Sequence, residues 1–158
     1  MKRLILLLLL SPFALADEMT LHCVMSKFIE QHTNGRSRSF DRESDSWFFS
    51  GFYEPVLKIK PDEKTISIDM GLNLVPNSEL KNHTYSENGN QLAFTDTVET
   101  TAGLYKSMYT LNKITGRFEK FQEKFTHSTS YANDKEAKWT LEKTSIDYYN
   151  CTKKEALF

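Results

Sequence analysis

The feature that most constrains this 158-residue chain is its pair of cysteines, because the only two, Cys23 and Cys151, lie near its opposite ends. They allow a single pairing, which an oxidising compartment favours. Loop-closure entropy makes such a long-range bridge worth about 4–5 kcal/mol of stability. Bridged cysteines have Cα atoms within about 7 Å of each other. The pair therefore predicts a disulfide and places the first and last structured segments side by side.

The N-terminus has the pattern of a secretory signal peptide. Basic residues, a leucine-rich apolar run and small residues follow one another and end at Ala16, and the apolar run is too short to span a bilayer stably. We therefore expect a signal peptide at 1–16 and a single secreted β domain at 17–158, with no transmembrane anchor after signal removal. A short signal of this kind predicts a bacterial origin and a periplasmic or secreted location.

The charge balance excludes some classes of partner. The formal net charge is −1, from 20 basic and 21 acidic residues spread along the chain. A surface of mixed sign does not steer DNA, RNA or anionic lipid towards a protein. The sequence therefore predicts no nucleic-acid partner.

Aromatic residues dominate the composition and favour strands. The chain has 11 Phe, 7 Tyr and 2 Trp but only 6 Gly and 4 Pro, and aromatic side chains suit half-buried, pleated surfaces. Turn signals separate the aromatic segments at short intervals, which is typical of an antiparallel all-β domain. Strands are predicted at 20–29, 47–53, 56–59, 66–68, 83–85, 92–94, 104–111, 117–125 and 148–151, with Gly51 as a bulge, a possible helical turn at 76–78, and polar loops at 31–45 and 127–136.

One segment carries a conflicting pattern. Phe118, Phe121 and Phe125 have helical spacing, but a tight turn precedes them and the neighbouring segments are strands, so we expect 117–125 to be a strand. About eight to nine strands whose first and last members are tied by a disulfide favour a single antiparallel β-barrel or barrel-like sheet. A β-sandwich is the alternative.

No chemical motif identifies an active site. The histidines His22, His32, His83 and His127 lack metal-ligand spacing. No nucleophile elbow or glycine-rich phosphate loop is present, and both cysteines are assigned to the disulfide. We therefore predict no catalytic residue, no metal and no cofactor. A hydrolase whose carboxylates converge only in space remains an alternative.

The stretch at residues 50–53 resembles a short motif of one known family. Ser50-Gly51-Phe52-Tyr53 is similar to the Ser-Gly-x-x-Tyr stretch that small disulfide-bonded periplasmic barrels present to lysozyme. Here Tyr53 stands one position early, and Glu54 occupies the expected place. The similarity covers only these residues, so lysozyme inhibition is just one example of a binding function.

The aromatic surplus supports a binding hypothesis beside a simple role in the core. Trp and Tyr often anchor partners at the rim of a rigid β scaffold, and binding residues also favour loops. We therefore expect a non-enzymatic domain that binds an envelope or extracellular protein, a glycan or an apolar ligand. An envelope assembly or structural subunit is a further alternative. The candidate contact residues are Trp47, Phe49, Tyr53, Tyr105, Tyr109 and Trp139.

Overall fold

The structure is a computed structural model that describes residues 18–51, 54–69, 82–128 and 138–153. The predicted signal peptide, the candidate Tyr53 and the possible helical turn at 76–78 lie outside these ranges. Within them the chain forms ten strands and one short helix. Their bounds are β1 (Met19–His32), β2 (Ser37–Asp41), α1 (Ser46–Phe49), β3 (Val56–Lys60), β4 (Thr65–Asp69), β5 (His83–Thr84), β6 (Ser86–Asn88), β7 (Gln91–Thr100), β8 (Gly103–Asn112), β9 (Arg117–Ser128) and β10 (Lys138–Lys153).

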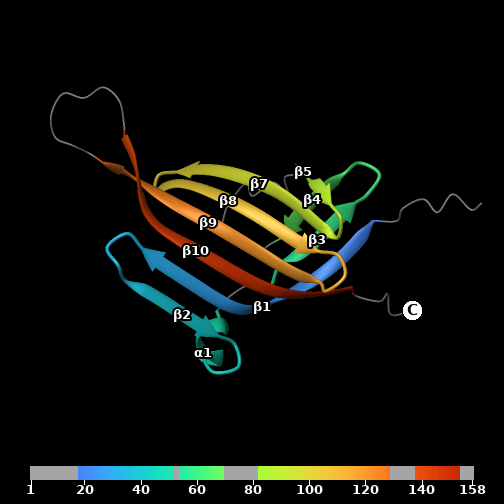
Figure 1. The fold of residues 1–158 in the computed structure, drawn as a ribbon, viewed down its shortest axis with the longest axis horizontal. Coiled ribbons are helices and arrows are strands. Elements are labelled where there is room, and N and C mark those ends of the chain that lie inside the picture. Colours follow the sequence, from blue (N-terminus) through green and yellow to red (C-terminus); the bar gives the residue numbers. More distant parts are fainter. Residues whose placement is uncertain (1–17, 52–53, 70–81, 129–137, 154–158) are drawn as a thin grey trace, which may run out of the picture.

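The strands form one antiparallel sheet that curves into a nearly closed barrel (Figure 1). The order is β5-β4-β3-β1-β10-β9-β8-β7-β6, with β2 paired to β1 off this path. The two outermost strands, β5 and β6, are consecutive in sequence and are separated only by Tyr85. The Tyr85 N–H donates to the Lys64 carbonyl in the β3–β4 turn at 3.1 Å. The chain itself therefore bridges the two ends of the sheet, which confirms the barrel-like prediction.

The predicted disulfide joins the first and last strands. Cys23 and Cys151 are bonded, and they oppose each other directly in the register of β1 with β10. That register continues from Leu21 opposite Lys153 to His32 opposite Lys143, with one shift between Met25 and Lys27. The two ends of the described chain thus form the central strand pair of the sheet.

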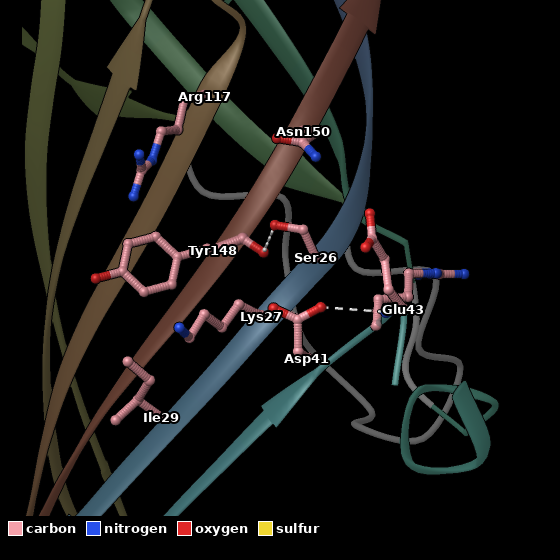
Figure 2. A pocket seen from close by; sticks show the side chains of 9 residues that line it. Ser26, Lys27, Ile29, Asp41, Glu43, Arg117, Tyr148 and Asn150 are labelled. Carbon is pink, nitrogen blue, oxygen red and sulfur yellow. Dashed lines mark hydrogen bonds between the residues drawn. The ribbon is translucent and has the colours of Figure 1, made fainter. Parts of the chain in front are cut away.

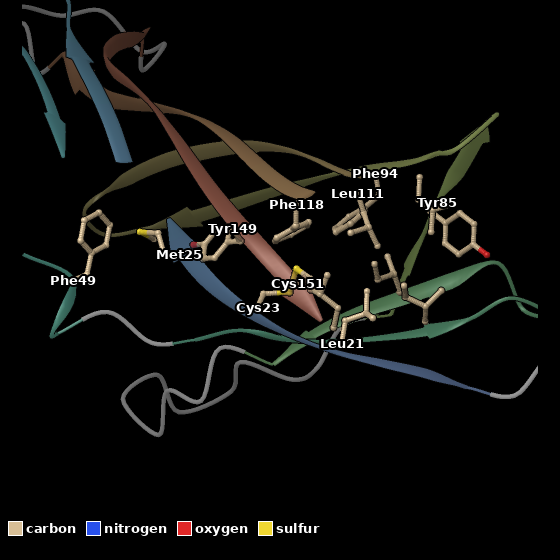
Figure 3. Packing of buried hydrophobic residues seen from close by; sticks show 14 residues of the cluster. Leu21, Cys23, Met25, Phe49, Tyr85, Phe94, Leu111, Phe118, Tyr149 and Cys151 are labelled. Carbon is tan, nitrogen blue, oxygen red and sulfur yellow. A yellow bond between two sulfur atoms is a disulfide. The ribbon is translucent and has the colours of Figure 1, made fainter. Parts of the chain in front are cut away.

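The core fills the inside of the barrel. The buried hydrophobic residues include Leu21, Cys23, Met25, Phe49, Leu57, Ile59, Ile66, Tyr85, Leu92, Phe94, Leu111, Phe118, Tyr149 and Cys151. Figure 3 shows them running from Phe49 and Met25 past the disulfide to Tyr85. Aromatic rings make up a row across the sheet: His83, Phe94, Tyr109, Phe118 and Tyr149 follow one another at centroid distances of 5.2, 4.6, 6.0 and 5.5 Å.

The strand predicted at 47–53 is wrong. Ser46–Phe49 forms one helical turn, in which the Phe48 N–H donates to the Asp45 carbonyl at 2.9 Å. The helix stacks Phe48 on Phe40 at 3.9 Å while burying Phe49 in the core. An extended strand would send these two adjacent side chains to opposite faces. The predicted bulge at Gly51 is wrong as well, because Gly51 lies in a turn.

The polar loop predicted at 31–45 contains a strand. β2 pairs with β1 from Lys27 opposite Asp41 to Gln31 opposite Ser37. Its side chains are mostly exposed, and only Phe40 is partly buried. An edge strand of this kind lacks the apolar alternation by which strands are recognised in a sequence.

The strand predicted at 117–125 is confirmed by β9. Phe118 is buried on the inner face of the sheet, opposite Tyr149 and Leu111. Phe121 and Phe125 differ from Phe118 by odd numbers of positions and therefore lie on the outer face. The three phenylalanines therefore have helical spacing but lie on the two opposite faces of a strand.

No helix in the described part of the chain is long and apolar enough to cross a membrane. The disulfide is compatible with an extracellular or periplasmic compartment.

Gly116 in the β8–β9 turn provides a test of the packing around the disulfide. Its φ is +69°, and an added Cβ would lie 2.2 Å from the carbonyl oxygen of Cys151. We expect Gly116→Ala to lower the free energy of unfolding by about 3 kcal/mol or more, since it combines an unfavourable backbone conformation with a backbone clash. Urea denaturation measures the change.

Gly35→Ala is the matched control. Gly35 also has a positive φ, +85°, but an added Cβ would meet nothing within 4 Å. Its expected loss is about 1 kcal/mol from the backbone conformation alone. Equal losses in the two variants would contradict the close approach of the turn to β10.

Candidate functional site

The structure spreads the aromatic candidates over several places. Trp47 on α1 is 70% exposed and packs edge-on against Phe40 and Phe48, with both centroids at 6.0 Å. Phe49, two residues on, is only 3% exposed and belongs to the core. The two α1 candidates therefore differ in kind, one being a surface side chain and the other a packing residue.

The candidates on the long strands face different neighbours. Tyr105 and Tyr109 lie on the inner face of β8, and Tyr109 stacks on Phe94 at 4.6 Å. Burial raises the pKa of Tyr109. Trp139 at the start of β10 packs on His127 at 4.0 Å. The candidates are not brought together in one site.

A cavity opens instead at the barrel end that holds the first residues of β1 and the last of β10. Its volume is ≈ 510 Å³, and more apolar than polar surface faces it. Apolar side chains from four strands line its wall: Leu21 of β1, Ile59 of β3, Leu92 of β7 and Leu111 of β8. We call this the mouth cavity. None of the five described aromatic candidates is among its lining residues.

The strand pattern explains why this end is apolar. Leu21 and Cys23 lie two positions apart on β1, as Leu92 and Phe94 do on β7. Residues two positions apart on a strand point to the same face, so the cavity residues continue the buried face of each strand. The mouth cavity is thus the open end of the core. Cys151 lines the cavity, and the buried side chains continue from Leu111 past Phe118 and the disulfide to Tyr149 (Figure 3).

The rim of the mouth cavity carries charge and one exposed apolar side chain. Lys113 forms an ion pair with Glu87 across the opening, and Lys113 lowers the pKa of Glu87. Lys153 of β10 also lines the cavity. Ile114, in the β8–β9 turn, is 74% exposed although it lines the same opening. An apolar wall beneath a charged rim suits a ligand with an apolar body and a polar end.

A group of charged side chains surrounds the buried carboxylate of Glu30 on β1. Glu30 is 4% exposed, and its carboxylate pairs with His32 at 2.8 Å, Arg38 at 2.7 Å and Lys143. Burial acts to raise the pKa of Glu30, but the hydrogen bonds from Lys143, His32 and Arg38 outweigh it and lower the pKa to about 2. Glu30 is therefore ionised and fully engaged at neutral pH.

Asp147 lies on the same face and has a different environment. It is 7% exposed, and its Oδ2 lies 3.7 Å from Lys120 Nζ. Its Oδ1 is buried without a hydrogen-bond partner among the described residues. Burial raises the pKa of Asp147, and Lys120 offsets part of that effect.

Glu30 and Asp147 are buried carboxylates on adjacent strands, and a pair of carboxylates is what the hydrolase alternative requires. Ser145 opposes Glu30, so Asp147 is its diagonal neighbour on the adjacent strand. Two carboxylates whose pKa values are shifted in opposite directions are typical of an acid and a base, but here the Glu30 carboxylate is engaged by Arg38, Lys143 and His32. The pair therefore has the character of a structural ion network. In the described ranges no group of three or more His, Cys, Asp or Glu could hold a metal.

The fold and the mouth cavity define a small disulfide-bonded antiparallel barrel with an open apolar end. No protein-family model, curated protein or solved structure matches the chain.

The sequence contained a weak signal for the mouth cavity. Ile114 is an apolar residue inside the polar turn 112–116. A side chain at the tip of a hairpin turn is not expected to be buried, so packing in the core does not account for an isoleucine there. The cavity wall carried no separate signal, because its leucines and isoleucines look like any other core residues until the strands are assembled.

The two buried carboxylates yield a test with opposite expected signs. Glu30→Gln should lower the free energy of unfolding at pH 7 by about 2–3 kcal/mol, because it removes an ionised group whose pKa falls from 4.5 to about 2 on folding. The wild-type contribution is fully present above pH 4.5 and is lost as the pH falls towards 2. Glu30→Gln should lack this part of the acid dependence, measured by denaturant unfolding between pH 2 and 7.

Asp147→Asn is the companion variant. The raised pKa of Asp147 means that its charged form is less favourable in the folded state than in the unfolded chain, so its cost grows as the pH rises above the ordinary value of 3.8. The amide should preserve or increase stability at pH 7. A large loss in Asp147→Asn with no loss in Glu30→Gln would refute this assignment.

Proposed function

We propose that the protein is a non-enzymatic binding module that takes an amphiphilic ligand, apolar end first, into the mouth cavity. The observation that carries the proposal is an open cavity of ≈ 510 Å³ whose wall is made by the leucine and isoleucine side chains of four strands. Sites for small molecules in proteins have volumes of about 300–1,000 Å³, are mostly apolar and hold few polar groups. The mouth cavity has all three properties.

The rim supports an anionic head group on the ligand. Lys113 is already paired with Glu87, whereas Lys153 makes no ion pair among the described residues. A carboxylate held at the opening would meet Lys153 while its apolar chain lies against Leu92 and Leu111. We therefore propose a fatty-acid-like carboxylate as the ligand class, bound in the periplasm or outside the cell of a bacterium, as the predicted signal peptide suggests.

Displacement of a dye tests this function. The purified, disulfide-bonded protein is mixed with N-phenyl-1-naphthylamine, whose fluorescence rises in an apolar site, and is titrated with decanoate. We expect decanoate to displace the dye. A dye signal that is absent, or unchanged by decanoate and by decanol, would refute the proposal.

Ile114→Ser should weaken decanoate binding without unfolding the protein. Ile114 is exposed in the free protein and lines the opening, so the variant loses apolar contact only in the complex. We expect an affinity loss of about fivefold, from roughly 1 kcal/mol of apolar contact. The readout is the decanoate titration with a parallel thermal melt.

Val98→Ser is the matched control for Ile114→Ser. Val98 is 41% exposed on β7 but is not among the residues that line the cavity. Its affinity should equal that of the wild type. A second variant, Lys153→Gln, should weaken decanoate and leave decanol unchanged; an equal effect on both would contradict the role of the rim charge.

A further inference from the structure

A second hollow lies on the outer face of the sheet, where β1 and β10 meet the turn after β2. Its volume is ≈ 590 Å³. Figure 2 shows the side chains that line it, and we call it the outer groove. The residues that matter to its chemistry are Ser26, Lys27, Asp41, Arg117, Tyr148 and Asn150. It shares only the strands β1 and β10 with the mouth cavity and no residue that lines both.

A β-bulge builds the floor of the outer groove. The register of β1 with β10 shifts between Met25 and Lys27, so Ser26 is the extra residue. The Arg42 N–H donates to the Ser26 carbonyl at 2.9 Å, and Arg42 Nη1 donates to the Met25 carbonyl at 3.0 Å. Bulges re-aim side chains and recur beside functional sites. Here the bulge brings Lys27 into register with Tyr148.

Tyr148 forms an aromatic platform between two cationic groups. The Arg117 guanidinium lies 4.8 Å from the centroid of its ring. In Figure 2 the Lys27 side chain lies on the opposite side of the ring from Arg117, and both line the same groove. Arg117 is also paired with Glu119 at 2.9 Å.

Lys27 is a lysine of the groove that has no ion-pair partner among the described residues. Asp41 is its cross-strand partner on β2, yet Asp41 Oδ1 accepts the Glu43 N–H at 3.2 Å. Lys27 makes no ion pair within the described ranges. Its ammonium group is therefore available to an anionic group in the groove.

The remaining lining selects a class of ligand. The Asn150 amide both donates and accepts hydrogen bonds, while Asp41 accepts them. The Ser26 hydroxyl donates to the Tyr148 carbonyl at 3.2 Å and can still accept. Sugar hydroxyls likewise donate and accept, and a sugar ring can stack on an aromatic face. Asp41 and Glu43 line the groove together with Lys27 and Arg117, so the groove carries charges of both signs.

We propose that the outer groove binds an oligosaccharide that carries carboxylate groups, with a sugar ring against Tyr148 and its carboxylate held by Lys27. The carboxylate satisfies the unpaired lysine, and the hydroxyls satisfy the mixed donors and acceptors around it. The site is independent of the mouth cavity, because the two cavities open on different faces of the β1–β10 pair.

Nuclear magnetic resonance titration of the disulfide-bonded protein with trigalacturonate tests the site. Backbone amide shifts are expected to change at Lys27, Tyr148 and Asn150. The neutral counterpart galactotriose should bind at least about tenfold more weakly, the loss of a charge-assisted contact. Equal binding of the two sugars, shift changes confined to other strands, or inorganic phosphate producing the same shifts would overturn the proposal.

Variants separate binding from folding. Lys27→Gln should weaken trigalacturonate about tenfold and leave galactotriose unchanged. Tyr148→Leu, which keeps an apolar side chain but removes the flat ring, should weaken both sugars. Lys106→Gln is the control, because Lys106 is an exposed lysine of the same outer face that lies over Phe125 and outside the groove. Loss of trigalacturonate binding in Lys106→Gln equal to that in Lys27→Gln would overturn the assignment.

Discussion

The pairing of β1 with β10, secured by the Cys23–Cys151 disulfide, is the interaction on which the rest of the structure depends. These two strands lie at the centre of the sheet order, with β3, β4 and β5 on one side and β9 to β6 on the other. In the described sheet this pair joins the two groups of strands by hydrogen bonding, and Tyr85 connects their outermost strands along the chain. Cross-linking residues 128 positions apart removes much of the entropy of the unfolded chain. A small domain with an open end in its core gains most from such a constraint.

The same strand pair contributes to both proposed sites. Its inner face provides Leu21 and Cys151 to the mouth cavity, and its outer face provides Lys27 and Tyr148 to the outer groove. Alternation of side chains along a strand makes this division possible, since neighbouring residues point to opposite faces. The bulge at Ser26 interrupts that alternation where the outer groove forms. One rigid pair of strands thereby positions an apolar site and a polar site independently.

Where β1 and β10 extend beyond the apolar core, they bury two carboxylates, Glu30 and Asp147. On the inner face, the ring of Tyr149 is followed along β10 by Asp147 and then by Ser145 and Lys143. The Glu30 carboxylate in this region is neutralised by two cations, Arg38 of β2 and Lys143 of β10. Removing the cations would leave the buried Glu30 carboxylate without partners, which is costly for a charge shielded from water. The network therefore favours one register of β1, β2 and β10 over shifted alternatives.

The errors of the sequence-based prediction have local causes. The segment at 47–53 is rich in aromatic residues and reads as a strand, but tertiary packing of Phe48 on Phe40 and of Phe49 in the core favours a helical turn. The sequence did not predict β2, because its side chains are nearly all exposed and show no apolar alternation. The segment is a strand because it pairs with β1. The aromatic candidates were chosen by residue type, which does not distinguish the exposed Trp47 from the buried Phe49.

The amino-acid sequence by itself determined the disulfide and the all-β class, because these depend on residue type, and the strand at 117–125, because a tight turn and neighbouring strands outweigh its helical spacing. Only the tertiary structure decided where the barrel stays open and which charges meet. The wall of the mouth cavity comes from β1, β3, β7 and β8, and the outer groove from β1, the turn after β2, β9 and β10. Segments so distant along the chain become neighbours only when strand order and register are established. No local pattern records that register.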